Sequence, residues 1–259
     1  MPSSLSFHGV YFTAHLGTYT ALSLYACLLT QLNPHNPNVV GYAQSELRNG
    51  FKGAGACFVP VSGATIDLTD LKVVGYDEVA EGECFVQILD SLGRGTASYY
   101  WYDLPDDGLY GWLDGADEPV TQGQITFSPG EAYWVKAPSA SYSIQSAGQV
   151  PTADIDVILR NGFKMIANPS PVDVDLNEIE VTGYDEVAEG ECFVQILDSL
   201  GRGTASYYWY DLPDDGLYGW LDGADEPVAP GTLSFTPGEG VWVKAPNTNY
   251  NLVFPGVSL

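Results

Sequence analysis

An internal repeat constrains this chain more than any other feature of its sequence. Residues 75–120 recur without a single change at residues 183–228, an offset of 108 positions. Shorter matches extend the repeat on both sides: 48–52 with 160–164, 127–138 with 235–246, and 141–148 with 249–256. Identical sequences in equivalent surroundings are expected to fold alike. The chain should therefore hold two copies of one module of about 110 residues.

The two copies differ in length at one place, which fixes the expected domain boundaries. The offset is 112 residues up to Lys52 and 108 residues from Gly75 onward, so the first copy carries four extra residues between these positions. We place the first module at residues 38–149 and the second at residues 150–259. Each is long enough to enclose a hydrophobic core of its own.

Residues 1–37 differ in kind from both modules. They contain no Lys, Arg, Asp or Glu, and they hold all three histidines. The apolar run from Thr18 to Leu32 is too short to span a bilayer as a helix, so no transmembrane span is expected. Its length suits a secretory signal, but the usual basic start and small-residue cleavage site are missing. An export segment, a structured extension or assembly strand, and a wrongly assigned start all fit this pattern.

The local pattern within each module is that of short strands. Residues 172–176 alternate between apolar and acidic types, as a half-buried strand does. Residues 85–89 and 98–104 are mostly apolar or aromatic and favour strands. Asp-Gly and Pro-Gly turn signals recur about every ten residues, which is the spacing of a sandwich or barrel. The predicted fold class is all-β, with two tandem β-sandwich or barrel-like modules that arose by an internal duplication.

The charge of the chain limits its partners. Asp and Glu number 33 against 9 Lys and Arg, which gives a formal net charge of −24. Such a field repels phosphate backbones and anionic lipid surfaces, so we expect no nucleic-acid partner and no peripheral membrane binding. The acidic side chains keep an extracellular protein soluble, and they also attract cations.

Four cysteines are too few for a disulfide scaffold. Cys84 and Cys192 occupy equivalent positions before the same apolar run, where buried free thiols are the simpler interpretation. A bridge between Cys57 and Cys84 also fits the first copy, whereas Pro169 stands where the second copy would need a partner for Cys192. The disulfide state of these cysteines, and that of Cys27, stays open at this point.

A family resemblance appears in the order of the motifs. The second copy runs through Asn-Gly-Phe-Lys-Met-Ile-Ala-Asn-Pro at 161–169, Tyr-Trp-Tyr-Asp at 208–211, Tyr-Gly-Trp-Leu at 218–221 and Pro-Gly-Glu-Gly-Val-Trp-Val at 237–243. This order resembles the tandem β-modules of secreted and surface proteins from Verrucomicrobia-like bacteria, which open with a Gly-Trp-Asn-Leu-Ile type strand and close with a Pro-Gly-Lys-Gly-Tyr-Trp-Val type strand. The resemblance covers residues 38–259 and implies a secreted or cell-surface location in a bacterium. It carries over no catalytic residues, and it departs at residues 1–37, where those proteins have an ordinary signal peptide.

Motifs for catalysis are missing from both copies. Neither contains a histidine, and the chain has no Gly-x-Ser-x-Gly, His-Glu-x-x-His or phosphate-loop sequence. Paired carboxylates of the glycosidase kind are abundant, but an acidic surface supplies as many by chance. We therefore expect no catalytic residues and no enzyme activity, and we rank a glycoside-acting enzyme below the structural and binding classes.

Calcium is the cofactor that the acidic turns favour. It binds about six to eight oxygen atoms, and closely spaced carboxylates on turns supply them. The candidate ligands are the acidic residues of two turns in each copy: Asp103, Asp106, Asp107, Asp114, Asp117, Glu118, Asp211, Asp214, Asp215, Asp222, Asp225 and Glu226. The alternative is a set of solvated turns in which each Asp caps its own backbone.

The aromatic run at residues 99–102 raises a carbohydrate hypothesis. Tyr99 and Trp101 share one face of the predicted strand, and Tyr100 and Tyr102 share the other. One face has to be core, and the other offers rings on which sugars stack. The candidate ligand-binding residues are Tyr99, Trp101, Trp112, Tyr207, Trp209 and Trp220. The alternative, which we favour, is that a neighbouring strand or the sister module covers the second face.

These observations favour a non-catalytic extracellular protein with a structural, adhesive or filament-forming role. The alternative is a carbohydrate-binding module that uses exposed aromatic residues. The expected partners are further copies of the chain or a polysaccharide. Self-assembly would proceed head to tail, because a contact between the two copies can recur between neighbouring chains, or by strand donation from residues 1–37.

Overall fold

The computed structural model shows an all-β chain, in which β-strands and short 3-10 helices form the regular structure of the described residues. Those residues are 40–60, 64–75, 81–89, 94–104, 106, 108–183, 189–197, 202–212, 214 and 216–258. The expectations for residues 1–37 therefore fall outside the described part of the chain. Within that part, the structure has no helix with the length and apolar character needed to cross a membrane.

The strands fall into two sets, which we call the first half (residues 40–149) and the second half (residues 150–258). The first half contains β1 (Val40–Glu46), β2 (Gly50–Gly55), β3 (Ile66–Asp67), η1 (Leu68–Asp70), β4 (Lys72–Val74), β5 (Glu81–Leu89), β6 (Gly95–Leu104), β7 (Leu109–Leu113), β8 (Thr126–Phe127), β9 (Ala132–Ala137) and β10 (Ser143–Gln149). The second half contains β11 (Ile155–Ile158), β12 (Gly162–Ala167), β13 (Val174–Asp175), η3 (Leu176–Glu178), β14 (Glu180–Thr182), β15 (Glu189–Leu197), β16 (Gly203–Leu212), β17 (Leu217–Leu221), β18 (Ser234–Phe235), β19 (Gly240–Ala245) and β20 (Asn251–Phe254).

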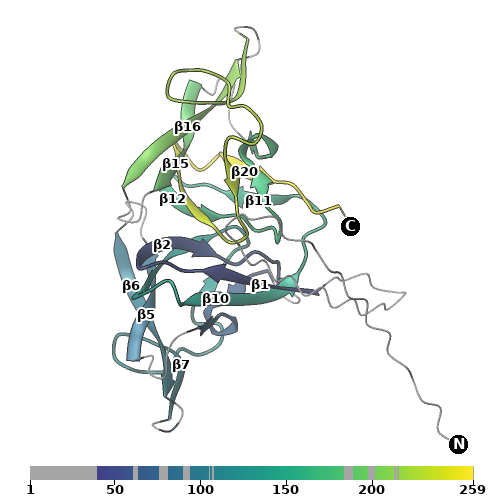
Figure 1. Cartoon of the computed structure of the whole chain (residues 1–259). Helices are drawn as coiled ribbons and strands as arrows, with labels where there is room; N and C mark the ends of the chain where they lie inside the picture. Colours follow the sequence, from purple (N-terminus) through teal and green to yellow (C-terminus); the bar gives the residue numbers. More distant parts are fainter. Residues whose placement is uncertain are drawn as a thin grey trace, which may run out of the picture.

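Both halves join their strands in the same order. A five-stranded sheet runs β2-β9-β5-β6-β7 in the first half and β12-β19-β15-β16-β17 in the second. Three-stranded sheets follow the orders β1-β10-β4 and β11-β20-β14, and β3-β8 and β13-β18 form two-stranded sheets. The antiparallel register also repeats, since Trp101 pairs with Trp112 and Trp209 pairs with Trp220. In Figure 1 the five-stranded sheets line one side of the molecule, and β1, β10, β11 and β20 lie on the other.

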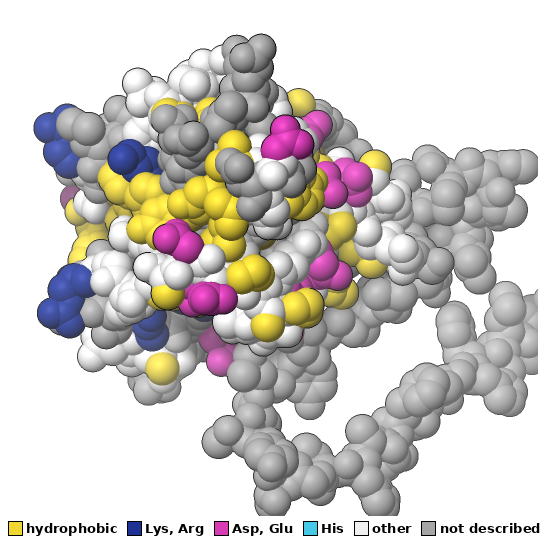
Figure 2. Space-filling view, turned by 90° about the horizontal axis from the view of Figure 1, so that it is seen from above, with side chains coloured by type: hydrophobic (Ala, Val, Ile, Leu, Met, Phe, Trp, Pro, Cys, Tyr) yellow, Lys and Arg dark blue, Asp and Glu magenta, His cyan; other side chains and the backbone are white. Residues whose placement is uncertain are grey.

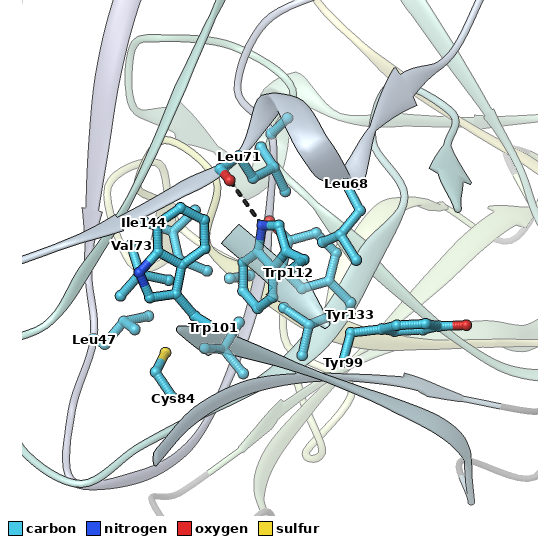
Figure 3. Close-up of a cluster of buried hydrophobic side chains, with 14 of the residues drawn as sticks. Leu47, Leu68, Leu71, Val73, Cys84, Tyr99, Trp101, Trp112, Tyr133 and Ile144 are labelled. Atoms are coloured by element: carbon cyan, nitrogen blue, oxygen red, sulfur yellow. Dashed lines mark hydrogen bonds between the residues drawn. The ribbon is translucent and has the colours of Figure 1, made fainter. Parts of the chain in front are cut away.

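Each half encloses a hydrophobic core of its own, because alternate residues of its strands point to the same side. Cys84, Val86 and Trp101 enter the first core from the five-stranded sheet, and Ile144 enters it from the three-stranded sheet. Figure 3 shows Trp112 against Leu71, whose carbonyl oxygen accepts a hydrogen bond of 2.8 Å from the indole Nε1. The second core repeats these contacts with the equivalent residues. Two smaller buried clusters join the halves: Trp134 with Met165 and Trp242, and Cys57 and Phe58 with Val150.

A carboxylate caps the short helix in each half: Asp67, which is buried, in the first and Asp175, which is half-buried, in the second. The Oδ1 atom of Asp67 accepts hydrogen bonds from the backbone N–H and the hydroxyl of Thr69, and its Oδ2 atom accepts one from the Gly123 N–H. Asp175 accepts equivalent bonds from the N–H groups of Asn177 and Gly231. Burial by itself would raise the pKa of both carboxyl groups, but these hydrogen bonds outweigh it and lower the pKa. These hydrogen bonds stabilise the first turn of each 3-10 helix and define where it begins.

The four extra residues of the first half lie in the loop between β2 and β3. Strand β2 precedes its counterpart β12 by 112 positions, whereas β3 precedes its counterpart β13 by 108. In the second half, Asn168 closes the shorter loop: its Nδ2 donates to the carbonyl oxygens of Val172 and Phe235, and its Oδ1 accepts from the Ser170 N–H. The first half has Ala56 at that position. Its longer loop instead pairs with the end of β10, through two hydrogen bonds of 3.0 and 2.9 Å between Val59 and Gln149.

The halves meet through a reciprocal contact at β2 and β12, which face each other in Figure 1. The Gly55 N–H donates to the Gly238 carbonyl at 2.9 Å, and the Ala167 N–H donates to the Gly130 carbonyl at the same distance. Ala167 is the counterpart of Gly55, and Gly238 is the counterpart of Gly130. The two bonds therefore exchange places under an approximate two-fold rotation that relates the halves.

This contact bears on the head-to-tail arrangement expected from the sequence. In a two-fold contact both members use the same patch of surface, so a contact made within one chain leaves neither patch for a neighbouring chain. Repetition along a filament requires a different patch on each member. In the closed chain both patches are used within the chain, and self-assembly, head to tail or by strand donation, stays a prediction.

Candidate functional site

The aromatic residues predicted to bind a ligand belong to the two cores. Trp101, Trp112, Trp209 and Trp220 are only 3–4% exposed, and Tyr99 is 9% exposed. Tyr207 is partly buried against the second core. The four tryptophans belong to the cores, where sheet-to-sheet packing covers their rings, so they offer no open surface for a sugar. The face of the strand that carries Tyr99 and Trp101 is thus the core face, and Tyr100 lies on the other, partly exposed face.

The outward face of each five-stranded sheet carries a second set of aromatic rings. Strand alternation turns Tyr100 of β6 and Phe85 of β5 away from the core, and their ring centroids lie 5.4 Å apart. Phe51 of β2 follows at 6.0 Å from Phe85, and Trp134 of β9 follows at 5.8 Å from Phe51. Four strands thus contribute one ring each to a continuous row.

The row continues across the boundary between the halves. Trp134 contacts Trp242 of the second half with a centroid distance of 6.2 Å, and Trp242 contacts Phe163 at 6.0 Å. Phe193 and Tyr208 complete the row at spacings that match those of the first half. We call this row the aromatic strip; its members are Tyr100, Phe85, Phe51, Trp134, Trp242, Phe163, Phe193 and Tyr208. The two tryptophans at its centre are 8% exposed, and the other six rings are half-buried.

An exposed lysine lies over the aromatic strip in each half. The Lys136 Nζ is 5.5 Å from the centroid of Phe85, and the Lys244 Nζ is at the same distance from the centroid of Phe193. A cation at this distance is attracted to the negative face of the ring. Each end of the aromatic strip therefore combines apolar ring surface with a hydrogen-bond donor. Figure 2 shows hydrophobic side chains gathered in one area, with Lys and Arg toward one edge of the molecule.

The acidic turns are the predicted calcium sites. No group of three or more Asp, Glu, Cys or His side chains that could hold a metal ion occurs among the described residues, and Asp107 and Asp215 fall outside them. The Asp114 Oδ1 accepts hydrogen bonds from the N–H groups of Ala116 and Glu118, and Asp222 repeats this pattern. These bonds are those of an Asp-capped turn. Calcium binding stays a prediction, tested by comparing melting temperatures in CaCl2 and in NaCl of equal ionic strength.

The described cysteines are buried free thiols. Cys84 and Cys192 pack in the two cores, whereas Cys57 packs with Phe58 and Val150 in a separate cluster. The bridge between Cys57 and Cys84 is therefore not formed, while the interpretation of Cys84 and Cys192 as free thiols is confirmed. Burial raises the pKa of Cys57 to about 11 and that of Cys84 and Cys192 to about 12, which disfavours their thiolate forms.

A recess of about 300 Å³ lies between the halves, with Arg160, Lys164 and Glu131 among its lining residues. These polar groups hold the local backbone: Lys164 donates to the Ile158 carbonyl, Arg160 donates to the Phe163 carbonyl, and Glu131 accepts from the Ser128 N–H. The counterparts Lys52, Arg48 and Glu239 make the same three kinds of bond in the equivalent places. The charged residues that line the recess thus have a structural role, because the same hydrogen bonds to the backbone occur in both halves.

The candidate residues Tyr99 and Trp101 and the ring of Tyr100 lie on opposite faces of the same strand. Phe51 and Phe163 are single aromatic residues on strands remote in sequence from residues 99–102, so no local pattern connected them with Tyr100. Their connection requires the sheet order, which places β2 beside β9 and β9 beside β5. Comparison of the chain with protein-family models, curated proteins and solved structures found no match.

Proposed function

We propose that this chain is a non-catalytic, extracellular adhesive protein, built as two tandem β-sandwich modules from an internal duplication, that binds a neutral polysaccharide along the aromatic strip. The observation that carries the proposal is the row of half-buried rings on the outward face of each five-stranded sheet, with the buried Trp134 and Trp242 joining the two rows at the boundary. An outward sheet face is ordinarily polar, and contiguous apolar surface on it is typical of an interaction site.

A polysaccharide suits this surface for two physical reasons. The C–H faces of sugar rings pack on aromatic rings, while their hydroxyl groups accept hydrogen bonds from donors such as Lys136 and Lys244. The two-fold arrangement also supplies two equivalent subsites on one surface. A polymer engages both at once, and the second contact then benefits from a high effective concentration. The polymer should be neutral because the net charge of −24 repels polyanions.

The absence of catalysis is part of the proposal. Its support is that the buried thiols stay protonated at neutral pH and that Asp67 and Asp175 are committed to helix caps. Incubation with a bound polysaccharide should therefore release no reducing ends. A steady release that scales with protein concentration would contradict this part of the proposal.

The binding part is tested by pull-down on insoluble cellulose, chitin and starch, with the acidic polymer alginate as a comparison. The double variant Tyr100→Ala with Tyr208→Ala removes the outermost ring at each end of the aromatic strip. The matched control is Tyr110→Ala with Tyr218→Ala, which removes tyrosines that are 59% and 66% exposed outside the aromatic strip.

We expect the wild-type protein and the control to bind at least one neutral polymer, and the strip variant to bind it more weakly. Isothermal titration should also show weaker binding to a short oligosaccharide of the same sugar than to the polymer. Retention of none of the neutral polymers, or equal loss in both double variants, would overturn the proposal.

A further inference from the structure

We propose that the recess between the halves is a binding site for a single neutral sugar unit. Its volume of about 300 Å³ is at the lower end of the range for small-ligand sites, which suits a ligand of one or two rings. Such sites are common where two structural units of a protein meet. The recess is separate from the aromatic strip, so a free sugar can bind there whether or not a polymer binds along the strip.

The lining of the recess combines apolar surface with charged groups, as small-ligand sites do. Ile88, Ile125 and Met165 supply apolar side chains, and Glu131 and Lys164 supply the charges. Lys164 and Met165 come from β12 of the second half, whereas the other three residues belong to the first half. The recess therefore exists only where the two halves are held together.

The two charged side chains keep hydrogen-bonding capacity that the protein does not use. Of the three N–H groups on the Lys164 Nζ, one donates to the Ile158 carbonyl at 2.8 Å. Of the two oxygens of Glu131, Oε2 accepts from the Ser128 N–H at 3.1 Å. Neither side chain makes a further hydrogen bond within the described part of the chain. Burial lowers the pKa of Lys164 and the charge of Glu131 opposes this shift, so the two groups are close enough to share one ligand.

This unused capacity matches the hydroxyl groups of a neutral sugar. A hydroxyl both donates and accepts, so hydroxyls of one ring can accept from Lys164 and donate to Glu131. An anion would be repelled by the Glu131 carboxylate and by the net charge of −24, and a cation would be repelled by Lys164. Arg160 also lines the recess, but the chain itself engages it, through the Phe163 carbonyl and a further interaction.

Tyr99 gives the recess an aromatic side chain. It lines the recess from β6 and is 9% exposed. Figure 3 shows its hydroxyl directed away from the other labelled side chains of the first core. Its hydroxyl is a third polar group for the ligand, and the edge of its ring offers apolar contact to the C–H groups of a sugar. Tyr99 thus packs in the first core and also borders the recess.

The approximate two-fold rotation between the halves supplies a matched control. Lys52 and Glu239, the counterparts of the two charged residues, make the same kinds of backbone hydrogen bond. The lining differs in between, because Thr232 replaces Gln124, a residue of the recess whose side-chain NH2 makes no hydrogen bond within the described part of the chain. We therefore expect one sugar site per chain.

The test is a ligand-observed NMR titration of the full chain with glucose, galactose, mannose and N-acetylglucosamine, and with glucuronate as the anionic comparison. The recess variant carries Glu131→Gln and Lys164→Met. The control variant carries Lys52→Met and Glu239→Gln, which remove the equivalent charges and the equivalent bond to the backbone on the other side of the boundary. The double variant Tyr100→Ala with Tyr208→Ala, which alters only the aromatic strip, is titrated in parallel.

We expect the wild type to bind at least one neutral sugar, and the recess variant to bind it about tenfold more weakly or worse, because it loses a hydrogen bond from a charged group. The control and the aromatic-strip variant should bind as tightly as the wild type. Four results would each overturn the proposal: no binding of any neutral sugar, tighter binding of glucuronate than of every neutral sugar, equal weakening in the recess variant and its control, or loss of binding in the aromatic-strip variant.

A second pair of variants covers the case in which the recess variant does not fold. Ala97 lines the recess, and Ala205 is its counterpart in the identical segment of the second half. Ala97→Leu places a larger side chain in the recess and removes no hydrogen bond, so it should weaken sugar binding, whereas Ala205→Leu should not. Unchanged binding by an Ala97→Leu variant whose circular dichroism shows the β-structure of the wild type would show that the sugar does not occupy the recess.

Discussion

Two tryptophans in the same core should respond very differently to the same substitution. Trp101 and Trp112 are each 3% exposed, and their ring centroids lie 5.3 Å apart. The Trp112 Nε1 donates to the Leu71 carbonyl at 2.8 Å, whereas the buried Trp101 Nε1 has no hydrogen-bond partner in the described structure. Substitution by Phe removes the N–H in both cases and a similar amount of ring, so the comparison isolates the hydrogen bond.

The expected difference follows from the cost of unpaired polar groups. Trp112→Phe leaves the Leu71 carbonyl without this donor, which costs about 1–3 kcal/mol, whereas Trp101→Phe removes an unpaired donor and recovers a penalty of about the same size. Loss of ring volume destabilises both variants, but it largely cancels in the comparison. Trp112→Phe should therefore lower the free energy of unfolding by at least about 2 kcal/mol more than Trp101→Phe.

Urea unfolding followed by far-ultraviolet circular dichroism measures this difference, since tryptophan fluorescence changes with the substitutions themselves. The second half supplies an internal replicate, because the Trp220 Nε1 donates to the Ile179 carbonyl at 2.8 Å and the Trp209 Nε1 has no partner in the described structure. The same ranking is expected there. Equal destabilisation by the two substitutions in both halves would refute the reasoning from hydrogen-bond satisfaction.

Two further predictions concern the buried thiols and the helix caps. In a Cys27→Ser background, iodoacetamide at pH 8 should label the native protein hardly at all and the urea-unfolded protein at three sites, namely Cys57, Cys84 and Cys192; rapid labelling of the native protein would contradict their burial. Because the hydrogen-bonded Asp67 and Asp175 have a lowered pKa in the folded state, their stabilisation is present above the ordinary pKa of 3.8 and is lost as the pH falls through the folded value. The double variant Asp67→Asn with Asp175→Asn should therefore have a lower free energy of unfolding than the wild type at pH 7, and that free energy should fall less than the wild type's below about pH 4. Urea titrations at each pH measure both quantities. If the double variant lost as much stability in acid as the wild type, the caps would be excluded as the origin of the acid dependence.

Local patterns anticipated the β-structure well. The apolar run that begins at Phe85 lies in β5, and the aromatic run at residues 99–102 lies in β6, as their composition predicted. The alternating segment at residues 172–176 was expected as one strand, but only Val174–Asp175 pairs in β13, and Leu176 begins the helix η3. Asp175 decides this difference, since its side chain caps the helix and ends the strand.

The sequence by itself determined the strand content, the repeat and the two opposite faces of each strand, because these depend on residues close together in the chain. It did not determine which face is buried. Trp101 lies inward because Trp112, on the neighbouring strand, is fixed by Leu71, which is 41 residues away along the chain. The aromatic strip and the two-fold contact likewise depend on residues from both halves, such as Trp134 with Trp242 and Gly55 with Gly238. Only the tertiary structure brings these pairs together, since contacts between distant residues are decided by packing and not by local preference.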